Sequence, residues 1–263
     1  MLGPACTRKL VGPMLLQSFL GTESSRQPAD GGSREALFFV HIPKCAGSSF
    51  RQVLKHWFGR DALFLDTHDA SELERAVKRI GRPPRAIAGH IPFGLHGGLK
   101  LRPCYVSLVR HPLDRLISIH GHAQRTPGHP LHVDAASMDV EAFYHFTLSN
   151  PGGRNRTVGI QCHFLSGART FEEARSVIDR SYALVAPIER YDDFVEACAE
   201  RFGRRPDIPP PRNVSPDGPI DPQVRAVLEH RIEVDHAEDL RLYRYVSDTF
   251  DARRGSLSFA QRV

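Results

Sequence analysis

The chain has 263 residues, of which 41% are hydrophobic and 25% are charged, and its formal net charge is +5. This is an ordinary globular composition, long enough for one sizeable α/β domain, and no internal linker divides it into two. The modest positive charge suits an anionic ligand, but the chain has no long run of Lys or Arg, which argues against a nucleic-acid partner.

The five cysteines lie far apart in the sequence, and none of them forms a CxxC pair. An odd number of dispersed cysteines argues against a disulfide scaffold and against a zinc ribbon. We therefore expect reduced thiols and a cytoplasmic protein.

Residues 1–35 are predicted to be a poorly ordered leader and linker. The apolar stretch 10–20 is interrupted by Gly12 and Pro13 and is too short to span a bilayer, so we expect no stable membrane insertion. Basic residues precede this stretch, as in a secretory signal, but no A-x-A-like cleavage site follows it. The polar, Gly- and Ser-containing sequence that comes next is typical of a linker, and we expect the folded domain over 36–263.

The folded domain is predicted to open with a strand, a loop and a helix. The run LFFVHI at 37–42 is continuously apolar, as in a buried strand. After the loop PKCAGSS, apolar side chains from Phe50 to Phe58 recur at helical spacing. A strand, a short glycine-containing loop and a helix make the βα unit of a nucleotide-binding fold.

The rest of the chain alternates between strand and helix patterns. We expect strands over 85–90, 104–109 and 182–189, helices over 71–80, from Pro112, over 191–203 and from Asp221, and irregular structure over 124–140 and 206–219. The segment that begins at Ser71 has the form of a capping box, and Pro112 suits a first helical position. The alternation predicts an α/β fold with a mostly parallel central sheet and helices on both faces.

Four residues of the first loop suit an anion: Lys44, Gly47, Ser48 and Ser49. Backbone N–H groups at the start of a helix attract negative charge, Gly47 allows a close approach, and the Lys44 ammonium adds a positive charge. The alternative is a plain βα turn with a capping serine. This is not the nucleoside-triphosphate loop GxxxxGK[ST], because Lys44 precedes Gly47.

A second candidate anion site lies at 110–118. Arg110 ends a predicted strand, and an Arg at that end points into the crevice where open α/β sheets bind ligands. On the helix that follows, the apolar residues face the core and leave Asp114, Arg115 and Ser118 on another face. The alternative is that Arg110 is a surface residue and that Ser118 is an ordinary helix serine.

His90 is the first candidate for a general base. It follows a short predicted strand, and an imidazole at that position can take a proton from an acceptor hydroxyl. His111 and His120 are the next candidates. The histidines between 120 and 132 lack an HExxH or Cys/His pattern, so we expect no metal site.

Two of these segments resemble the sulfotransferases that use 3′-phosphoadenosine 5′-phosphosulfate (PAPS). Residues 41–50, HIPKCAGSSF, are similar to the 5′-phosphosulfate loop of the carbohydrate branch, typified by heparan sulfate 2-O-sulfotransferase and its bacterial relatives. Residues 108–118, LVRHPLDRLIS, are similar to the 3′-phosphate motif of the family. Cys45 stands where the family more often has Thr, so a hydroxyl donor is lost and an oxidisable thiol is gained.

The resemblance implies a single P-loop-like domain and a role for each matching residue. The loop that binds the 5′-phosphosulfate would consist of Lys44, Cys45, Ala46, Gly47, Ser48 and Ser49. Arg110 and Ser118 would bind the 3′-phosphate, and Arg115 would be structural. His90, in a segment similar to the family's G-H-x-x-[FY], would be the catalytic base.

The resemblance continues more weakly to about residue 250. In the segment 159–167, Gly159 and His163 stand where Asn and Arg are more usual, which leaves a ligand role there open. In the late loop RNVSP, Arg212 either touches a phosphate or is simply solvated.

The implied reaction is in-line transfer of a sulfuryl group from PAPS, as co-substrate, to an acceptor hydroxyl, with a carbohydrate acceptor by the family branch. His90 would remove the hydroxyl proton, and Lys44 with the loop amides would stabilise the leaving phosphate, without a metal. One alternative is a kinase-like phosphoryl transferase, against which the lysine order and the lack of a Mg²⁺-binding carboxylate at a strand end both argue. The other is a non-catalytic module that binds a nucleotide or a glycan.

Overall fold

The structure is a computed structural model and describes residues 35–206 and 220–259. The predicted leader 1–35, except for its last residue, lies outside the described residues. So does most of the Pro-rich segment that contains Arg212.

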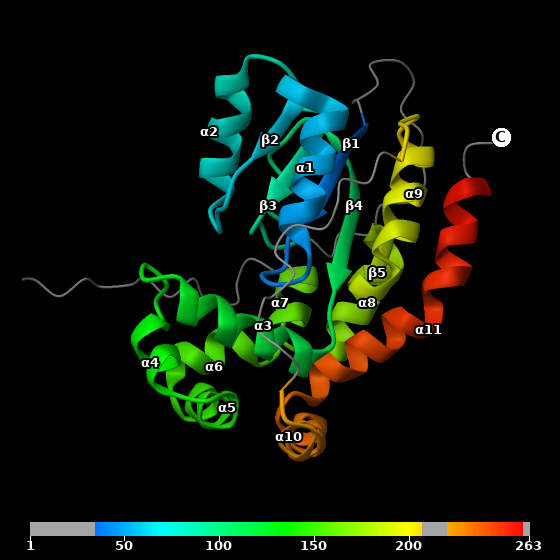
Figure 1. The fold of residues 1–263 in the computed structure, drawn as a ribbon. Helices are drawn as coiled ribbons and strands as arrows, with labels where there is room; N and C mark the ends of the chain where they lie inside the picture. The colour runs from blue at the N-terminus through cyan, green and yellow to red at the C-terminus, as the bar shows by residue number, and fades with distance from the viewer. Residues whose placement is uncertain (1–34, 207–219, 260–263) are drawn as a thin grey trace, which may run out of the picture. The chain divides into compact units, whose positions relative to one another are not determined.

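Within the described residues, five strands form one sheet in the order β2-β3-β1-β4-β5, and every neighbouring pair is parallel. The strands are β1 (Glu35–Val40), β2 (Ala62–Phe64), β3 (Ala86–Gly89), β4 (Arg102–Val109) and β5 (Tyr182–Pro187). The α-helices are α1 (Gly47–Phe58), α2 (Ala70–Ile80), α3 (Pro112–Arg125), α4 (His132–Ser137), α5 (Val140–Ser149), α6 (Pro151–Thr157), α7 (Ile160–Ser166), α8 (Phe171–Ser181), α9 (Tyr191–Arg201), α10 (Pro222–Asp235) and α11 (Ala237–Phe259). The predicted fold class, an α/β domain with a parallel sheet and helices around it, is confirmed (Figure 1).

β1 lies in the middle of the sheet and is buried on both faces. Successive side chains of a strand point to opposite faces. Phe39 packs against Phe50 of α1 and Phe194 of α9, with ring centroids 4.8 Å and 6.5 Å away. Phe38 instead packs against Tyr105 of β4 at 4.9 Å. Burial of both faces explains why this segment is continuously apolar rather than alternating.

A second hydrophobic cluster lies in a layer of helices formed by α3, α4, α5 and α10. Its buried side chains include Leu113, Phe143 and Ile232. Figure 1 shows this helical layer beyond the carboxyl end of β4, where the chain leaves the sheet through α3. The end of the sheet at which open α/β folds bind ligands therefore faces a floor of helices.

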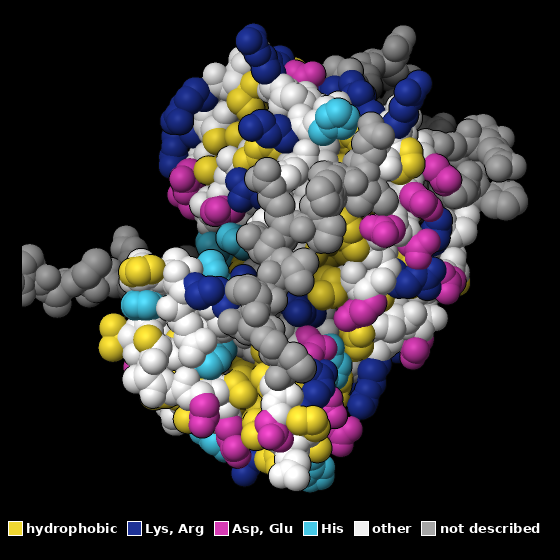
Figure 2. All heavy atoms as spheres, viewed as in Figure 1, with side chains coloured by type: hydrophobic (Ala, Val, Ile, Leu, Met, Phe, Trp, Pro, Cys, Tyr) yellow, Lys and Arg dark blue, Asp and Glu magenta, His cyan; other side chains and the backbone are white. Residues whose placement is uncertain are grey.

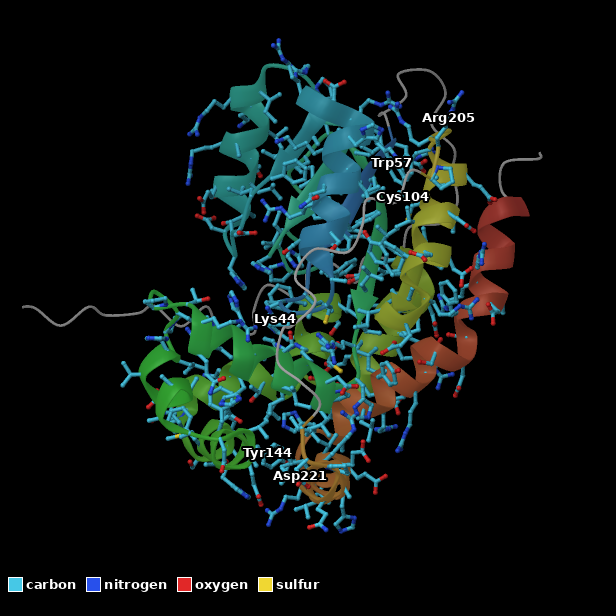
Figure 3. All side chains as sticks on the ribbon, viewed as in Figure 1. Lys44, Trp57, Cys104, Tyr144, Arg205 and Asp221 are labelled. Atoms are coloured by element: carbon cyan, nitrogen blue, oxygen red, sulfur yellow. The ribbon has the colours of Figure 1, made fainter. Side chains whose placement is uncertain are left out.

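The opposite end of α1 is anchored to the segment that follows α9. The indole Nε1–H of Trp57 donates a hydrogen bond to the backbone oxygen of Arg205 at 2.9 Å. Figure 3 labels both residues at the end of α1 that is farther from Lys44. This hydrogen bond holds the C-terminal end of α1 in place and so helps to position the helix as a whole. The N-terminal end of α1 follows directly on the loop after β1.

Two local predictions were wrong, and one strand was not predicted. The range 124–140 is not irregular throughout, because α4 occupies His132–Ser137. β2 was not predicted at all, since three residues are too few to show a periodicity. The cap of α2 is Asp69 and not Ser71: the Asp69 side chain accepts a hydrogen bond from the backbone N–H of Ser71 at 2.8 Å.

Candidate active site

A cavity of about 1130 Å³ lies between the carboxyl end of the sheet and the helical layer. Figure 2 shows His, Lys and Arg side chains gathered at the indentation between these two parts. The described residues that line the cavity come from the loop after β1, from the segments after β2, β3, β4 and β5, from α3, α6 and α7, and from the segments after α3 and α7. Of the residues predicted for the site, the following lie on its wall: Lys44, Ala46, Gly47, Ser48, Ser49, His90, Arg110 and Ser118.

The wall of this cavity is cationic. Its basic residues are Lys44, Arg110, Arg115, Arg125, Arg156 and Arg169, and its histidines are His41, His68, His90, His122, His129 and His163. None of the lining residues found within the described ranges is Asp or Glu. Such a wall suits a ligand with several negative charges.

The loop after β1 has the backbone of an anion cradle. Lys44 and Ala46 both adopt the left-handed conformation, with φ of 69° and 55°. Left-handed residues alternating along a turn bring successive N–H groups to one side. A Cβ atom at Gly47 would fall 1.8 Å from Cδ2 of His41, so only glycine leaves room for that ring. The sequence therefore places Gly47 where the chain must approach a side chain as well as a ligand.

Cys45 differs from its neighbours in the loop, because its side chain points away from the cavity. The thiol is fully buried, and its Sγ lies 3.5 Å from Oε1 of Gln161. Burial raises the pKa of this thiol to about 12, which keeps it protonated and unreactive. The expected oxidisable thiol is therefore not exposed at the site, and only the backbone of Cys45 belongs to the loop.

Arg110 lies directly beside this loop. Its guanidinium Nη1 donates a hydrogen bond to the backbone oxygen of Lys44 at 3.3 Å. The Gln161 amide holds the Arg110 backbone on both sides, accepting from its N–H at 2.9 Å and donating to its carbonyl at 2.8 Å. Burial, followed by the charges of Arg110 and Arg125, lowers the pKa of the Lys44 ammonium. The Lys44 ammonium and the Arg110 guanidinium therefore repel each other, and an anion bound between them would relieve this repulsion.

Arg115 is buried, although the sequence placed it on a different face of the helix from the apolar residues that face the core. Its side chain is 2% exposed, and it donates to the backbone oxygens of Pro43 at 3.1 Å and Arg156 at 2.9 Å. It thus ties the loop after β1 to α6. The predicted structural role fits these contacts, while the predicted face does not.

Near Arg115 lies Asp239, which the sequence gave no reason to select. This buried carboxylate accepts hydrogen bonds from the backbone N–H groups of Gln161 and Cys162, each at 3.1 Å. Burial raises its pKa, against the attraction of Arg115. In the sequence it is one acidic residue in the first turn of a helix, a common pattern that carries no signal for burial.

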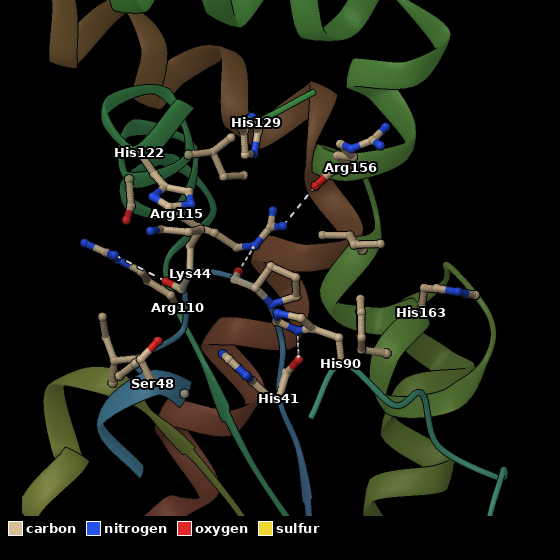
Figure 4. A pocket seen from close by; sticks show the side chains of 18 of the residues that line it. His41, Lys44, Ser48, His90, Arg110, Arg115, His122, His129, Arg156 and His163 are labelled. Carbon is tan, nitrogen blue, oxygen red and sulfur yellow. Dashed lines mark hydrogen bonds between the residues drawn. The ribbon is translucent and has the colours of Figure 1, made fainter. Parts of the chain in front are cut away.

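His90 has a fixed orientation on the cavity wall (Figure 4). Its Nδ1 lies 2.7 Å from the backbone oxygen of His41, which can only accept, so Nδ1 carries a proton. The lone pair of the neutral ring is then on Nε2. The backbone N–H of His90 donates to Asp66 at 2.8 Å, and Arg51 lies 3.6 Å from the same carboxylate oxygen. The tautomer with its proton on Nδ1 is the one that a base acting through Nε2 requires.

Neither alternative candidate base reaches the cavity. His111 and His120 are absent from the part of the wall that the described residues form. His120 Nε2 is within 2.9 Å of the Met138 backbone oxygen, inside the helical layer. His111 instead lies 4.0 Å from Asp114 on its own helix.

The sequence did not single out His41, although this residue opens the segment 41–50 and lines the cavity. The basic segments 120–132 and 151–156, which by sequence could hold an anionic sugar or be solvated surface, reach the wall through His122, His129 and Arg156. The weakly matching segment 159–167 also reaches the wall, through Ile160, His163 and Phe164. Over residues 35–206 and 220–259, no three His, Cys, Asp or Glu side chains converge as a metal ion requires, and no helix combines the length and apolarity needed to cross a bilayer.

Comparison with known proteins finds little. No protein-family model matches the chain, and no curated protein matches it at a significant level. Among solved structures, the fold is similar to that of a sulfotransferase from Alicyclobacillus acidocaldarius, with a TM-score of 0.48 and 18% sequence identity over 85% of this chain and 100% of that one. A likeness at this level carries no argument about chemistry, so the assignment of a function depends on the residues of the cavity itself.

Proposed function

We propose that this chain is a sulfotransferase that moves a sulfuryl group from PAPS to an acceptor hydroxyl, with a carbohydrate as the acceptor. One observation carries the proposal: Lys44, Arg110, Ser118 and His90 line a single cavity whose described wall has no carboxylate. These residues belong to the three sequence segments that resemble the sulfotransferase family.

The cavity suits a donor with charge at both ends. The loop after β1 offers backbone N–H groups and the Lys44 ammonium to the 5′-phosphosulfate. Arg110, directly after β4, and Ser118, on α3, offer a guanidinium and a hydroxyl to the 3′-phosphate. Ser48 and Ser49 add hydroxyl donors at the start of α1.

The reaction follows from the position of His90. The acceptor oxygen forms a bond to sulfur while the bond from sulfur to the 5′-phosphate oxygen breaks, and that oxygen keeps the electron pair. Nε2 of His90 takes the hydroxyl proton, since Nδ1 is held by the His41 carbonyl. Lys44 and the loop amides stabilise the charge that gathers on the departing phosphate.

A carbohydrate acceptor is supported by the wall next to His90. The Phe164 ring lies 6.2 Å from the His90 ring, centroid to centroid, and His68 and His163 flank it at 5.9 Å and 6.2 Å. An apolar ring among hydrogen-bonding groups matches a sugar, which has an apolar face and a rim of hydroxyls.

Two other functions remain to be separated from this one. A phosphoryl transferase of the kinase type holds Mg²⁺ through carboxylates, and none of the lining residues within the described ranges is acidic. A module that only binds a nucleotide or a glycan has no need for an imidazole in a fixed tautomer.

The first test is calorimetric titration with PAP, the nucleotide product. We expect tight binding to the wild type and a loss of about tenfold or more on Arg110→Ala, because each charge-assisted hydrogen bond contributes about 1.5–3 kcal/mol. Arg79→Ala, on the exposed part of α2, is the matched control. If the folded wild type does not bind PAP but hydrolyses or transfers phosphate from ATP in the presence of Mg²⁺, the proposal is wrong. The chain is then a phosphoryl transferase of the kinase type.

A further inference from the structure

His41 is a buried polar side chain on the wall of the cavity that the proposed reaction does not yet use. It follows the last residue of β1, it is 6% exposed, and it lines the cavity. Its Nδ1 is buried and has no hydrogen-bond partner within the described residues. Contact with the cavity is therefore left to the opposite ring edge, which carries Cδ2 and Nε2.

Three contacts fix this ring. It stacks on Phe39 with centroids 5.8 Å apart and an interplanar angle of 17°. On the other side it lies 4.2 Å from the His90 ring. Its Cδ2–Nε2 edge fills the space over Gly47, where a Cβ would fall 1.8 Å from Cδ2 and 2.0 Å from Nε2. The Cδ2–Nε2 edge thus lies against the anion loop, and the ring as a whole lies beside the proposed base.

The His41 ring is neutral in the working range of pH. Burial, followed by the charges of His90 and Arg51, lowers its pKa to about 3, and Asp66 opposes this only weakly. A neutral imidazole has one N–H group. A buried N–H without an acceptor is rarer in proteins than an acceptor without a donor, so the proton belongs on Nε2 and the bare lone pair on the buried Nδ1.

We propose that His41 is a catalytic residue that donates a hydrogen bond from Nε2–H to the sulfuryl group while that group passes between Gly47 and His90. This role rests on the proposed sulfuryl transfer. His41 neither gains nor loses a proton: the proton of the acceptor goes to His90, and the electron pair goes to the 5′-phosphate oxygen. A neutral donor stabilises charge on the sulfuryl oxygens without competing with His90 for the acceptor proton.

Two substitutions separate the donor from the ring. His41→Phe keeps an aromatic ring over Gly47 and against His90 but removes the N–H. His41→Gln places an amide N–H near the position of Nε2. With PAPS and a hydroxyl acceptor, we expect His41→Phe to lower kcat by about 10²-fold, as removal of one preorganised donor does, and His41→Gln to recover at least tenfold of that loss.

The other measurements keep this inference separate from the proposed function. PAP affinity should stay within about twofold of wild type in both variants, because PAP lacks the sulfuryl group to which His41 would donate. An interaction that strengthens only in the transition state changes kcat. A wild-type kcat for His41→Phe, or an equal loss for both variants, would overturn the donor role. If His41→Phe does not fold, His41→Asn replaces it, because its shorter amide reaches only the Nδ1 position. Failure of the wild type to bind PAP would overturn the sulfotransferase proposal and this inference together.

Discussion

Three basic side chains meet where β1 ends, and their surroundings give each a different protonation behaviour. His41 is buried and neutral, with its pKa lowered to about 3. His90 is held through Nδ1, so its Nε2 is left to exchange a proton. Lys44 is charged but loses its proton more readily than an ordinary lysine, because burial and the neighbouring guanidiniums lower its pKa. Substitutions of His90 and of Lys44 test these differences.

Replacement of His90 should separate binding from chemistry. His90→Gln keeps a polar side chain but cannot accept the proton, so we expect kcat for sulfuryl transfer to fall by about 10²–10⁴-fold. PAP affinity should remain close to wild type. The comparison uses calorimetry with PAP and an assay of transfer from PAPS, with His145→Gln, an exposed residue of α5, as the control. Equal losses of PAP binding and transfer would mean that His90 holds the nucleotide instead.

The charge on Lys44 should make PAP binding depend on pH. A lysine with a lowered pKa loses its proton below the usual range of about 10. As the pH is raised, PAP affinity should therefore begin to fall at a lower pH than it would with an ordinary lysine. In Lys44→Arg the charge persists, so the decline should flatten. Titrations with PAP at a series of alkaline pH values measure both curves, and parallel curves for the two proteins would contradict the role of the Lys44 charge.

At the scale of elements, β1, its loop and α1 act as one unit. The sheet holds β1 on both sides, the loop turns through two left-handed residues, and α1 begins at Gly47. Because the His41 ring occupies the space over that glycine, the fit of loop to helix also sets the position of the neighbouring His41 and His90 rings. A small change in the loop should therefore disturb the whole centre.

Gly47→Ala tests this coupling. The added Cβ would overlap the His41 ring, and overpacking of this kind costs about 1–3 kcal/mol, so we expect PAP affinity to fall by about tenfold or more. Gly255→Ala on α11, where a Cβ meets nothing within 4 Å, should leave binding unchanged. Unaltered PAP binding and transfer in Gly47→Ala would show that the loop and the ring move independently.

The elements that the sequence predicted are those with a strong local pattern. β1 and β4 are continuous apolar runs, and α3 begins at Pro112 as its fixed φ favours. The short helices between α3 and β5 have no such pattern: α6, for instance, contains two glycines in seven residues. Helices of this length depend on packing against neighbours, which no local window contains.

The site divides in the same way. Lys44, Arg110 and His90 follow strands of a parallel sheet, and the carboxyl ends of such strands meet at one edge, so their convergence could be predicted. His129 and Arg156 reach the same cavity only because the helical layer folds back under the sheet. Their place follows from tertiary packing: by sequence their segments could either hold an anionic sugar or be solvated surface, and no local pattern decides between the two.

At the scale of the whole molecule, two buried imidazoles couple stability to acid. His41 and His236 are 6% and 2% exposed, and burial with nearby positive charge lowers their pKa values to about 3 and about 4. An unfolded histidine titrates near about 6.5. As the pH falls below that value the unfolded chain binds protons that the folded protein refuses, so the free energy of unfolding decreases until each folded pKa is reached.

Urea unfolding at pH 7, 5.5 and 4.5 measures this slope. Each such histidine contributes about 1.4 kcal/mol per pH unit inside its window. His236→Leu should therefore lose stability less steeply with acid than the wild type does, while His145→Leu, exposed on α5, should match the wild type. Identical slopes for His236→Leu and wild type would mean that His236 is protonated in the folded protein.

The hydrogen bonds that connect the segments around the cavity run from arginine side chains to backbone oxygens. Arg115 binds the backbone oxygens of Pro43 and Arg156, and Arg110 binds that of Lys44. A buried hydrogen bond from a guanidinium to a carbonyl is far less sensitive to ionic strength than attraction between two exposed charges is. Added salt should therefore leave the shape of the cavity intact while it weakens the capture of a polyanion from solution. The folded protein and its bound ligand would therefore respond differently to the same rise in ionic strength. The surrounding salt concentration would change the fraction of cavities that hold a ligand without weakening the fold.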